Sequence, residues 1–508
     1  MNLPRTFEEV KNSVLREEGE TYPGKSLVDM ELRPGYDRAK NSMIAHMLAI
    51  NEAHLLMLIK QEIITKEQGR VILHGLETID YDVYKRSNYS GEYEDLFFAI
   101  ESELIRRTNG LGGNLHLGRS RNDMCLCLSR MVIREDMLDL LKELIKVLNT
   151  VLRFAQAYKD CIYVVHTHTQ HAQPSVLGHY FLGVFEMLVR DVKRLKSAYN
   201  QINESPMGAA AITTSGFPLD RKFVSDLIGC DNFIYNAYDA IGNVDFFTET
   251  SAAISLAALN LGRVVTDMTL WATEELHMIR VSDGYISTSS IMPQKRNPIA
   301  LEHLRSNLSL TKGLADSIQL GFLKSPYGDI SDYEDAEEPM AQSMKQLRMN
   351  YHLFSAVLAT LEVDASTLST RAYESFSVVT EMADELYRRY RIPFRKAHHI
   401  VASLVKEAET KKINLKQIDE KLFSSVYERT MGLSFTGDFS SIRESLDPKR
   451  FIEKRGVEGG TSSMAMNSMI EKNENSLLEI QKWYDDLTSR LLQANMNRKE
   501  LVREILAT

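Results

Sequence analysis

The sequence predicts an all-α protein, and three observations lead to that prediction. Its 508 residues contain only 12 prolines, with none between residues 35 and 173 or between 219 and 292, and long proline-free tracts suit long helices. Apolar residues in several tracts recur every three or four positions, which is the spacing of one helix face. No convincing alternating strand, βαβ rhythm or solenoid repeat is present. Any β-structure is therefore expected to be limited to short hairpins.

Three tracts predict long helices. Residues 130–157 carry the stripe Met137, Leu141, Leu144, Leu148, Leu152 and Ala155. Residues 180–200 repeat the pattern with Phe181, Val184, Phe185, Leu188, Val192 and Leu195. Residues 246–280 are apolar on most faces, so several neighbours must bury this helix. Three long helices, one of them enclosed, indicate a bundle core and make a lone monomer doubtful.

The two ends of the chain differ from its middle. Residues 1–40 carry many charges and three of the prolines, which predicts an irregular arm. Residues 372–508 return to shorter amphipathic pieces. We therefore expect boundaries near residues 120 and 371. They would separate an N-terminal helical domain with an irregular arm (1–120), a central long-helix bundle (121–370) and a small C-terminal helical domain (371–508).

The composition excludes several classes of protein. Lys and Arg number 60 against 69 Asp and Glu, a formal net charge of −9, whereas binders of nucleic acids or anionic membranes usually show a basic excess. The first twenty residues are charged throughout, and no apolar stretch is long enough to cross a bilayer. Four cysteines exclude a disulfide scaffold. We expect a cytoplasmic protein without nucleic-acid or membrane partners.

The first segment that breaks the helical pattern is GGNLHLGRSRND, residues 112–123. Ser120, Arg121 and Asn122 offer a hydroxyl, a guanidinium and an amide in a row, a set that suits carboxylate recognition. Asp123 could serve as the N-cap of the following helix or as an arginine partner. The alternative interpretation is a polar loop that only starts a helix.

The second segment is HTHTQHAQPSVLGH, residues 166–179, which holds four of the thirteen histidines. A metal site is disfavoured because no Asp or Glu accompanies them, and His–x–His suits a strand better than a helix. One histidine acting as an acid or as a carboxylate partner is preferred, since its ordinary pKa lies near neutrality. Pro174 is expected where a loop enters the next helix.

The third segment is SDGYISTSSIMPQKRNP, residues 282–298, which makes an improbable helix. It predicts a long mobile loop, and such loops commonly close over substrates and exclude water. A serine there could act as a base if a lysine charge and backbone N–H groups stabilised its alkoxide. A plain surface loop is the alternative, and nothing in the sequence brings the three segments together.

These segments resemble a known family. STSSIMPQKRNP is similar to the signature loop of the fumarase/aspartase superfamily, usually G-S-S-x-M-P-x-K-x-N, and THTQHAQP is similar to its Thr-His region. GRSRND resembles argininosuccinate lyase. Supporting matches are EDLFFAIE (94–101), MGAAAITTSGFPLDR (207–221), FRKAHHIV (394–401) and GGTSS (459–463).

The resemblance implies a fold, an assembly and a reaction. The fold would have three domains and a long central helical bundle. The assembly would be a homotetramer whose active sites each draw on three subunits. The reaction would be elimination of fumarate from an N-substituted aspartate, with no metal and no organic cofactor.

The same resemblance assigns roles to residues. Ser289 would be the general base, and Lys295 and Asn297 would stabilise the doubly negative intermediate. His168 would lie on the acid side, either donating a proton or orienting other groups. The residues expected to bind the substrate are Ser120, Arg121, Asn122, Thr167, Lys295, Asn297 and Tyr327. Asp239 matches an acidic position of another family segment.

One stretch departs from the family pattern. Residues 325–339, SPYGDISDYEDAEEP, are two residues longer than usual, with Glu334 in place of Gln and Glu337 in place of Lys. Added negative charge would favour a cationic amine. Argininosuccinate is therefore the default substrate, and a diamine-N,N′-disuccinate is the alternative. Adenylosuccinate fits GRSRND less well. An inactive, crystallin-like structural role would not require the retained polar residues.

Overall fold

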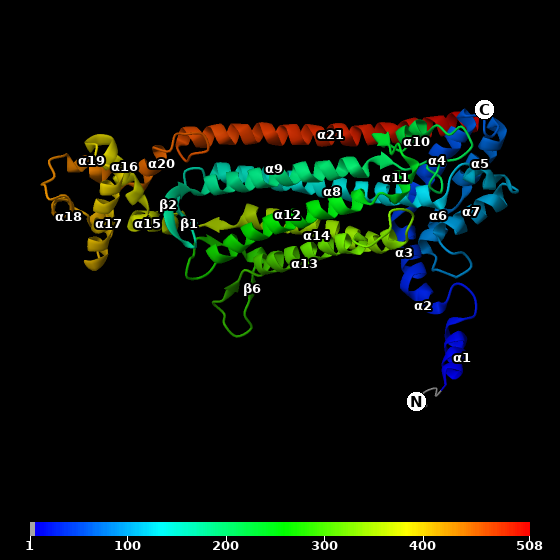
Figure 1. The fold of residues 1–508 in the computed structure, drawn as a ribbon, viewed down its shortest axis with the longest axis horizontal. Coiled ribbons are helices and arrows are strands. Elements are labelled where there is room, and N and C mark those ends of the chain that lie inside the picture. The colour runs from blue at the N-terminus through cyan, green and yellow to red at the C-terminus, as the bar shows by residue number, and fades with distance from the viewer. Residues whose placement is uncertain (1–5, 508) are drawn as a thin grey trace.

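The computed structural model describes residues 6–507 and is built mainly of helices. Figure 1 shows an elongated body of long, nearly parallel helices with a smaller helical part at each end. An N-terminal arm and the β6 hairpin project from the same side of this body. The predicted all-α class is confirmed.

Five long helices form the central bundle. They are α8 (Arg121–Ala157), α9 (Leu177–Ile202), α12 (Asp245–Trp271), α13 (Ile299–Phe322) and α14 (Asp332–Thr360). α12 packs on α13 and α9, while α14 packs on α13 and α8. The 45-residue helix α21 (Ser463–Ala507) runs along α8 and α9. Their inward stripes form one large apolar core, which includes the predicted stripes of α8 and α9.

The third predicted helix is shorter and less enclosed than expected. α12 ends at Trp271 rather than near 280, because the chain turns through His277 and forms β5 (Ile279–Arg280), which pairs with β8 (Glu362–Val363). Leu256 and Leu259 on α12 remain 42% and 47% exposed. One face of this apolar helix is therefore not covered within the chain.

The N-terminal part contradicts the prediction of an irregular arm. It contains α1 (Phe7–Glu18), α2 (Lys25–Leu27), the π-helical η1 (Val28–Leu32) and α3 (Arg33–Ser42). A capping box between Thr6 and Glu9 starts α1, and Pro34 lies in the first turn of α3, where proline is tolerated. The charges of residues 6–40 therefore lie on short exposed helices.

The remaining N-terminal helices surround a second apolar core. They are α4 (Ile44–Lys60), α5 (Lys66–Thr78), α6 (Tyr81–Arg86), α7 (Leu96–Arg107) and the 3₁₀-helix η2 (Leu111–His116). Within residues 6–507 no single helix is long and apolar enough to span a membrane. One pair bent by 74°, Lys25–Ser42 with Ile44–Lys60, passes by length and composition alone, and most of α4 is buried in this core.

A third apolar core lies at the opposite end of the bundle. Its helices are α16 (Val379–Tyr390), α17 (Phe394–Thr410), α18 (Glu420–Met431), α19 (Phe439–Glu444) and α20 (Pro448–Glu453), and α15 (Ala365–Glu374) leads into them. Short 3₁₀ turns η4 (Phe376–Val378) and η5 (Leu415–Gln417) complete this part. How the chain divides into domains near 120 and 371 stays a prediction.

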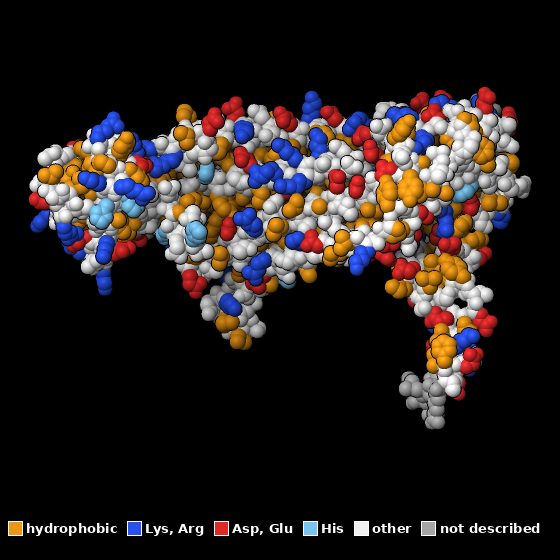
Figure 2. All heavy atoms as spheres, viewed as in Figure 1, with side chains coloured by type: hydrophobic (Ala, Val, Ile, Leu, Met, Phe, Trp, Pro, Cys, Tyr) orange, Lys and Arg blue, Asp and Glu red, His pale blue; other side chains and the backbone are white. Residues whose placement is uncertain are grey.

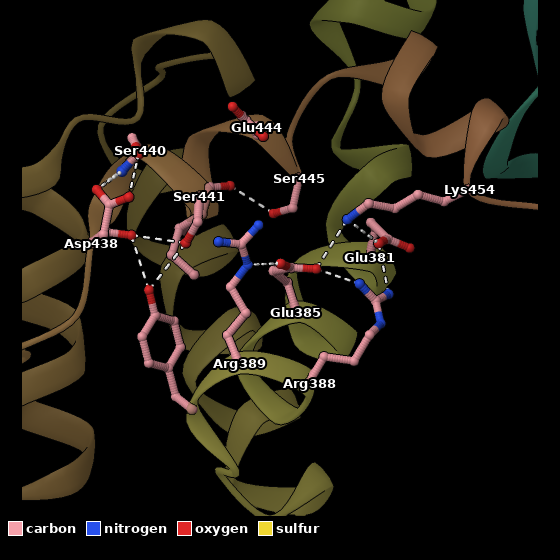
Figure 3. A network of polar contacts seen from close by, with 12 residues as sticks. Glu381, Glu385, Arg388, Arg389, Asp438, Ser440, Ser441, Glu444, Ser445 and Lys454 are labelled. Atoms are coloured by element: carbon pink, nitrogen blue, oxygen red, sulfur yellow. Dashed lines mark hydrogen bonds and ion pairs between the residues drawn. The ribbon is translucent and has the colours of Figure 1, made fainter.

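Two buried carboxylates connect α16 to the end of α20 (Figure 3). Glu381 accepts from Arg388 at 2.7 Å and pairs with Lys454 at 2.9 Å and with Arg455. Glu385 pairs with Lys454 at 3.0 Å and with Arg388 and Arg389. Burial opposes ionisation, but these charged hydrogen bonds hold the pKa of both carboxyls below the ordinary value.

Within residues 6–507 the β-structure consists of two-stranded pairs. β1 (Ile162–Thr167) and β2 (Gln170–Val176) form an antiparallel hairpin, and so do β6 (Ser287–Thr288) and β7 (Arg296–Asn297). β3 (Glu204–Ser205) pairs in parallel with β4 (Asn232–Phe233). Two short helices, α10 (Arg221–Leu227) and α11 (Ala237–Gly242), lie on either side of β4 in the sequence. The predicted restriction to short β-elements is confirmed.

Candidate active site

Ser120 begins the longest helix of the bundle. It is the N-cap of α8, and its Oγ accepts the backbone N–H of Asn122 at 3.3 Å. Asp123 completes a capping box by accepting the N–H of Ser120 at 3.0 Å. Asp123 is thus the third helical residue rather than the N-cap. The N-terminus of α8 presents Ser120, Arg121 and Asn122 in one turn, where a partial positive charge favours anions.

The guanidinium of Arg121 is held by the preceding helix. Its Nη1 lies 2.9 Å from Asp95 and 3.2 Å from Glu94, and the group stacks 4.7 Å from the ring centre of Phe98. Burial opposes the charge, but the Asp95 and Glu94 contacts raise the pKa of Arg121 above its ordinary value. Arg121 therefore stays cationic, with its orientation set by Asp95, the N-cap of α7.

Tyr327 lies near the same end of the bundle, after α13. Its hydroxyl donates to Asp239 Oδ1 at 2.7 Å, and this hydrogen bond, with burial, raises the pKa of Tyr327 to about 12. The hydroxyl of Tyr238 donates to the Tyr327 carbonyl at 2.9 Å. These hydrogen bonds fix the start of residues 325–339, the stretch that differs from the family pattern. A neutral, exposed Tyr327 hydroxyl follows from this geometry.

Thr167 and His168 occupy the tip of the β1–β2 hairpin. His168 and Thr169 have φ of 52° and 61°, left-handed values that make the tight turn, and both are exposed. His166 lies in β1, but His168 lies in the turn, so the expected strand holds only the first histidine of the His–x–His pair. Pro174 lies inside β2 rather than in a loop, and α9 starts only at Leu177. Among residues 6–507 no group of three or more His, Cys, Asp or Glu could hold a metal ion.

Ser289 lies just beyond the β6–β7 pair, in the projecting hairpin of Figure 1. Its Oγ accepts the backbone N–H of Met292 at 3.1 Å and that of Ile291 at 3.4 Å. Asn297 Nδ2 donates to Ser287 Oγ at 3.3 Å, which closes the base of the hairpin, and Lys295 is exposed. The predicted arrangement of backbone N–H groups around a serine oxygen is present at Ser289.

The predicted site residues fall into groups that lie far apart within one chain. α8 has 37 residues, so at 1.5 Å per residue it is about 55 Å long. Arg121 is at its start, whereas the β1–β2 hairpin follows its end (Figure 1). The ring centre of Trp271, at the end of α12, lies 6.4 Å from that of Tyr163 in β1. The loop after α12, which carries Ser289, therefore also begins at the end of the bundle opposite Arg121.

The structure corrects the interpretation of Glu337. Its carboxylate lies 2.7 Å from Arg38 Nε and accepts a hydrogen bond from Ser129. Its side chain is only 11% exposed, and burial raises the pKa of its carboxyl. The negative charge of Glu337 is therefore neutralised by Arg38 of α3 and is not offered to a substrate.

We expect Glu337→Lys to destabilise the protein without changing its substrate preference. The introduced ammonium group would face Arg38 in a poorly solvated place, and breaking such a pair costs roughly 3–5 kcal/mol. A thermal melt should show a clearly lower Tm. Glu338→Lys is the matched control, because Glu338 is the adjacent exposed residue. A normal Tm together with a shifted kcat/KM ratio between two aminosuccinates would contradict this expectation.

Sequence reasoning did not identify the partners of the predicted site residues. Asp95 and Glu94 orient Arg121, but in the sequence they stand out only as part of EDLFFAIE (94–101), a segment that resembles the family. Asp239 stands out as an acidic family position, although nothing in the sequence indicates its hydrogen bond to Tyr327, 88 positions away. No spacing pattern marks such pairs, since they lie on separate elements.

Comparison with known proteins finds relatives of this chain. A family model described as "Lyase" matches residues 76–310, and one described as "Argininosuccinate lyase C-terminal" matches 376–453. Argininosuccinate lyase 2 of Agrobacterium fabrum is 34% identical over 448 residues, 88% of this chain and 89% of that protein. Argininosuccinate lyase of Methanosarcina acetivorans is 32% identical over 457 residues, 88% of this chain and 91% of that protein.

Solved structures show the same relationship. A crystal structure of EDDS lyase in complex with formate has a TM-score of 0.85 and 26% identity, covering 98% of both chains. An EDDS lyase variant with bound fumarate gives the same TM-score and identity. These relatives are lyases, and their likeness covers the whole bundle. The chain belongs to the argininosuccinate lyase family of the fumarase/aspartase superfamily and is a carbon–nitrogen lyase.

Proposed function

We propose that the protein eliminates fumarate from an N-substituted aspartate, with argininosuccinate, which would yield arginine, as its first candidate substrate. The observation that most supports this chemistry is the pair of backbone N–H groups directed at Ser289 Oγ in an exposed hairpin. The curated relatives named argininosuccinate lyase support the choice of substrate. The acidic composition and few cysteines support a cytoplasmic location.

In the proposed mechanism, Ser289 Oγ removes a proton from the carbon next to a carboxylate of the substrate. The N–H groups of Ile291 and Met292 lower the energy of the serine alkoxide, and the Lys295 ammonium adds positive charge. The resulting dianionic intermediate is stabilised by Lys295 and Asn297. The carbon–nitrogen bond then breaks, and His168 either protonates the leaving nitrogen or orients the group that does.

The substrate carboxylates are proposed to bind the turn at the start of α8. Ser120 and Asn122 supply neutral donors there, and Arg121 supplies a fixed cation. Thr167 from the β1–β2 hairpin and Tyr327 complete the set. No metal or organic cofactor has a place in this scheme.

We also propose a homotetramer with active sites shared between subunits. Within one chain, α8 places the β1–β2 hairpin about 55 Å from Arg121, and the loop that carries Ser289 begins at the same far end of the bundle. A complete site therefore needs hairpins from other chains. Figure 2 shows hydrophobic side chains on the exposed surface of the bundle. The exposed leucines of the bundle include Leu256 and Leu259 on α12 and Leu310 and Leu320 on α13, which are 42–70% exposed. Exposed leucines on the helices of a bundle suit an interface between copies.

A diamine-N,N′-disuccinate is the second candidate substrate. Glu334 keeps exposed surface, but partial desolvation of its carboxyl and the charge of Glu337 raise its pKa, while Tyr333, Arg38 and Arg121 lower it. Asp329 is likewise exposed and within the electrostatic range of Arg121. A carboxylate-rich surface beside Arg121 would favour a cationic amine over an amino-acid carboxylate. The likeness to EDDS lyase over 98% of the chain also favours this candidate.

One assay separates these candidates. Fumarate release is followed by its ultraviolet absorbance with argininosuccinate and with ethylenediamine-N,N′-disuccinate, and the purified protein is sized by light scattering. Release from argininosuccinate supports the first candidate, and release from the diamine derivative alone supports the second. No release from any aminosuccinate would overturn the proposed function and favour a structural, crystallin-like role, whereas a stable monomer would overturn the proposed shared-site tetramer.

A further inference from the structure

Asp123 is a buried carboxylate one turn inside α8, with no exposed surface. Its two oxygens receive three backbone N–H groups. Oδ1 accepts from Ser120 at 3.0 Å, and Oδ2 accepts from Gly208 and Ala210, both at 2.9 Å. One side chain therefore joins the start of α8 to a segment 85 positions further along the chain.

The second segment, residues 206–211, is itself rigidly placed. Gly208 and Ala210 have left-handed φ values of 80° and 53°, which turn both N–H groups toward Asp123. Arg221 Nε donates to the Met207 carbonyl at 2.9 Å, and a Cβ on Gly208 would lie 2.7 Å from Arg221 Cγ. Arg221 thus packs against this segment from the side of α10.

The same segment also contacts a predicted substrate residue. The carbonyl of Ala211 accepts a hydrogen bond from Asn122 Nδ2 at 3.1 Å. The amide of Asn122 is therefore oriented by residues 206–211, and the position of that segment depends on Asp123. The contacts form a closed loop from Ser120 through Asp123 and Ala210 to Asn122.

We propose that Asp123 is the positioning residue that fixes the Ser120–Asn122 turn against residues 206–211 and so sets its geometry for binding substrate carboxylates. This inference rests on the proposed function of that turn. A carboxylate is required because two acceptor oxygens serve three donors, and neither oxygen can be replaced by an amide N–H. Asp123 itself contacts no substrate in this arrangement.

The test is Asp123→Asn. The asparagine has one acceptor oxygen, so its NH2 group would face a backbone N–H and break one side of the loop of contacts. Displacing the Ser120–Asn122 turn in this way is expected to raise KM by roughly tenfold to a hundredfold. The Kd for fumarate, measured by calorimetry, should rise by a similar factor. The change in kcat should be much smaller, because Ser289 and Lys295 are untouched.

Asp191→Asn is the matched control. Asp191 is also fully buried, and it accepts hydrogen bonds from Arg194 and Asn260 at 2.8 Å, but it lies on α9 away from this turn. A general effect of neutralising a buried aspartate would appear in both variants as a lower Tm. Only Asp123→Asn should weaken fumarate binding.

A second variant covers the case in which Asp123→Asn does not fold. Arg221→Gln loosens residues 206–211 from the other side and should raise the fumarate Kd in the same direction. Unchanged fumarate affinity in a folded Asp123→Asn protein, or in Arg221→Gln if only that variant folds, would overturn the inference. If the wild-type protein neither binds fumarate nor releases it from any aminosuccinate, the proposed function fails instead.

Discussion

Replacing Ser289 with alanine is expected to lower kcat for fumarate release by roughly a thousandfold. The variant loses only the oxygen that receives the N–H groups of Ile291 and Met292. KM should change little, because the substrate carboxylates are proposed to bind other side chains, those of Ser120, Arg121 and Asn122. Since the hydrogen bonds of the Ser289 side chain stay within its own hairpin, Tm and oligomeric state should match the wild type.

Ser290→Ala is the control for this experiment. Ser290 is the neighbouring exposed serine and carries the same hydroxyl on the same hairpin. It should retain nearly full activity, which would separate the loss of a base from a disturbed loop. A Ser289→Ala protein that kept most of its turnover would refute the assignment of Ser289 as the base. A large loss of activity in Ser290→Ala alone would identify Ser290 as the base instead.

Two inactive variants are expected to restore activity when they assemble together. Arg121→Gln removes the cation at the start of α8, and Ser289→Ala removes the proposed base, and each variant alone should be nearly inactive. If the two residues of one site come from different chains, random mixing leaves about a quarter of the sites intact. Co-expressed and co-purified mixtures should therefore regain about a quarter of wild-type fumarate release.

A mixture of Ser289→Ala with Lys295→Met is the matched control. Both changes lie in the same hairpin, so every hairpin in the mixture carries one defect and activity should stay low. Differently tagged chains would verify that mixed oligomers form. Mixed oligomers of Arg121→Gln and Ser289→Ala that remain inactive would show that the site is not shared as proposed. The physical basis of the prediction is the length of α8, which keeps Arg121 and the β1–β2 hairpin apart within a single chain.

Much of the fold could be predicted because its signals are local. The stripes of α8 and α9 recur every three or four residues, and an amphipathic helix depends on neighbours within that distance. The polar segments near Ser120, His168 and Ser289 are breaks in the same periodicity. The prediction of an irregular arm was wrong because many charges and prolines were taken as signs of irregular structure. The Thr6 cap starts α1, and α3 tolerates Pro34 in its first turn.

The sequence by itself determined the helix class, the three polar segments and the family. Only the tertiary structure decided which residues meet. Glu337 is neutralised by Arg38, 299 positions away, and Asp123 joins Gly208, 85 positions away. Helical periodicity records interactions within about four residues, whereas the choice of ion-pair and hydrogen-bond partners depends on how whole helices pack. For the same reason, the separation of Arg121 from the two hairpins became evident only with the path of α8 through the bundle.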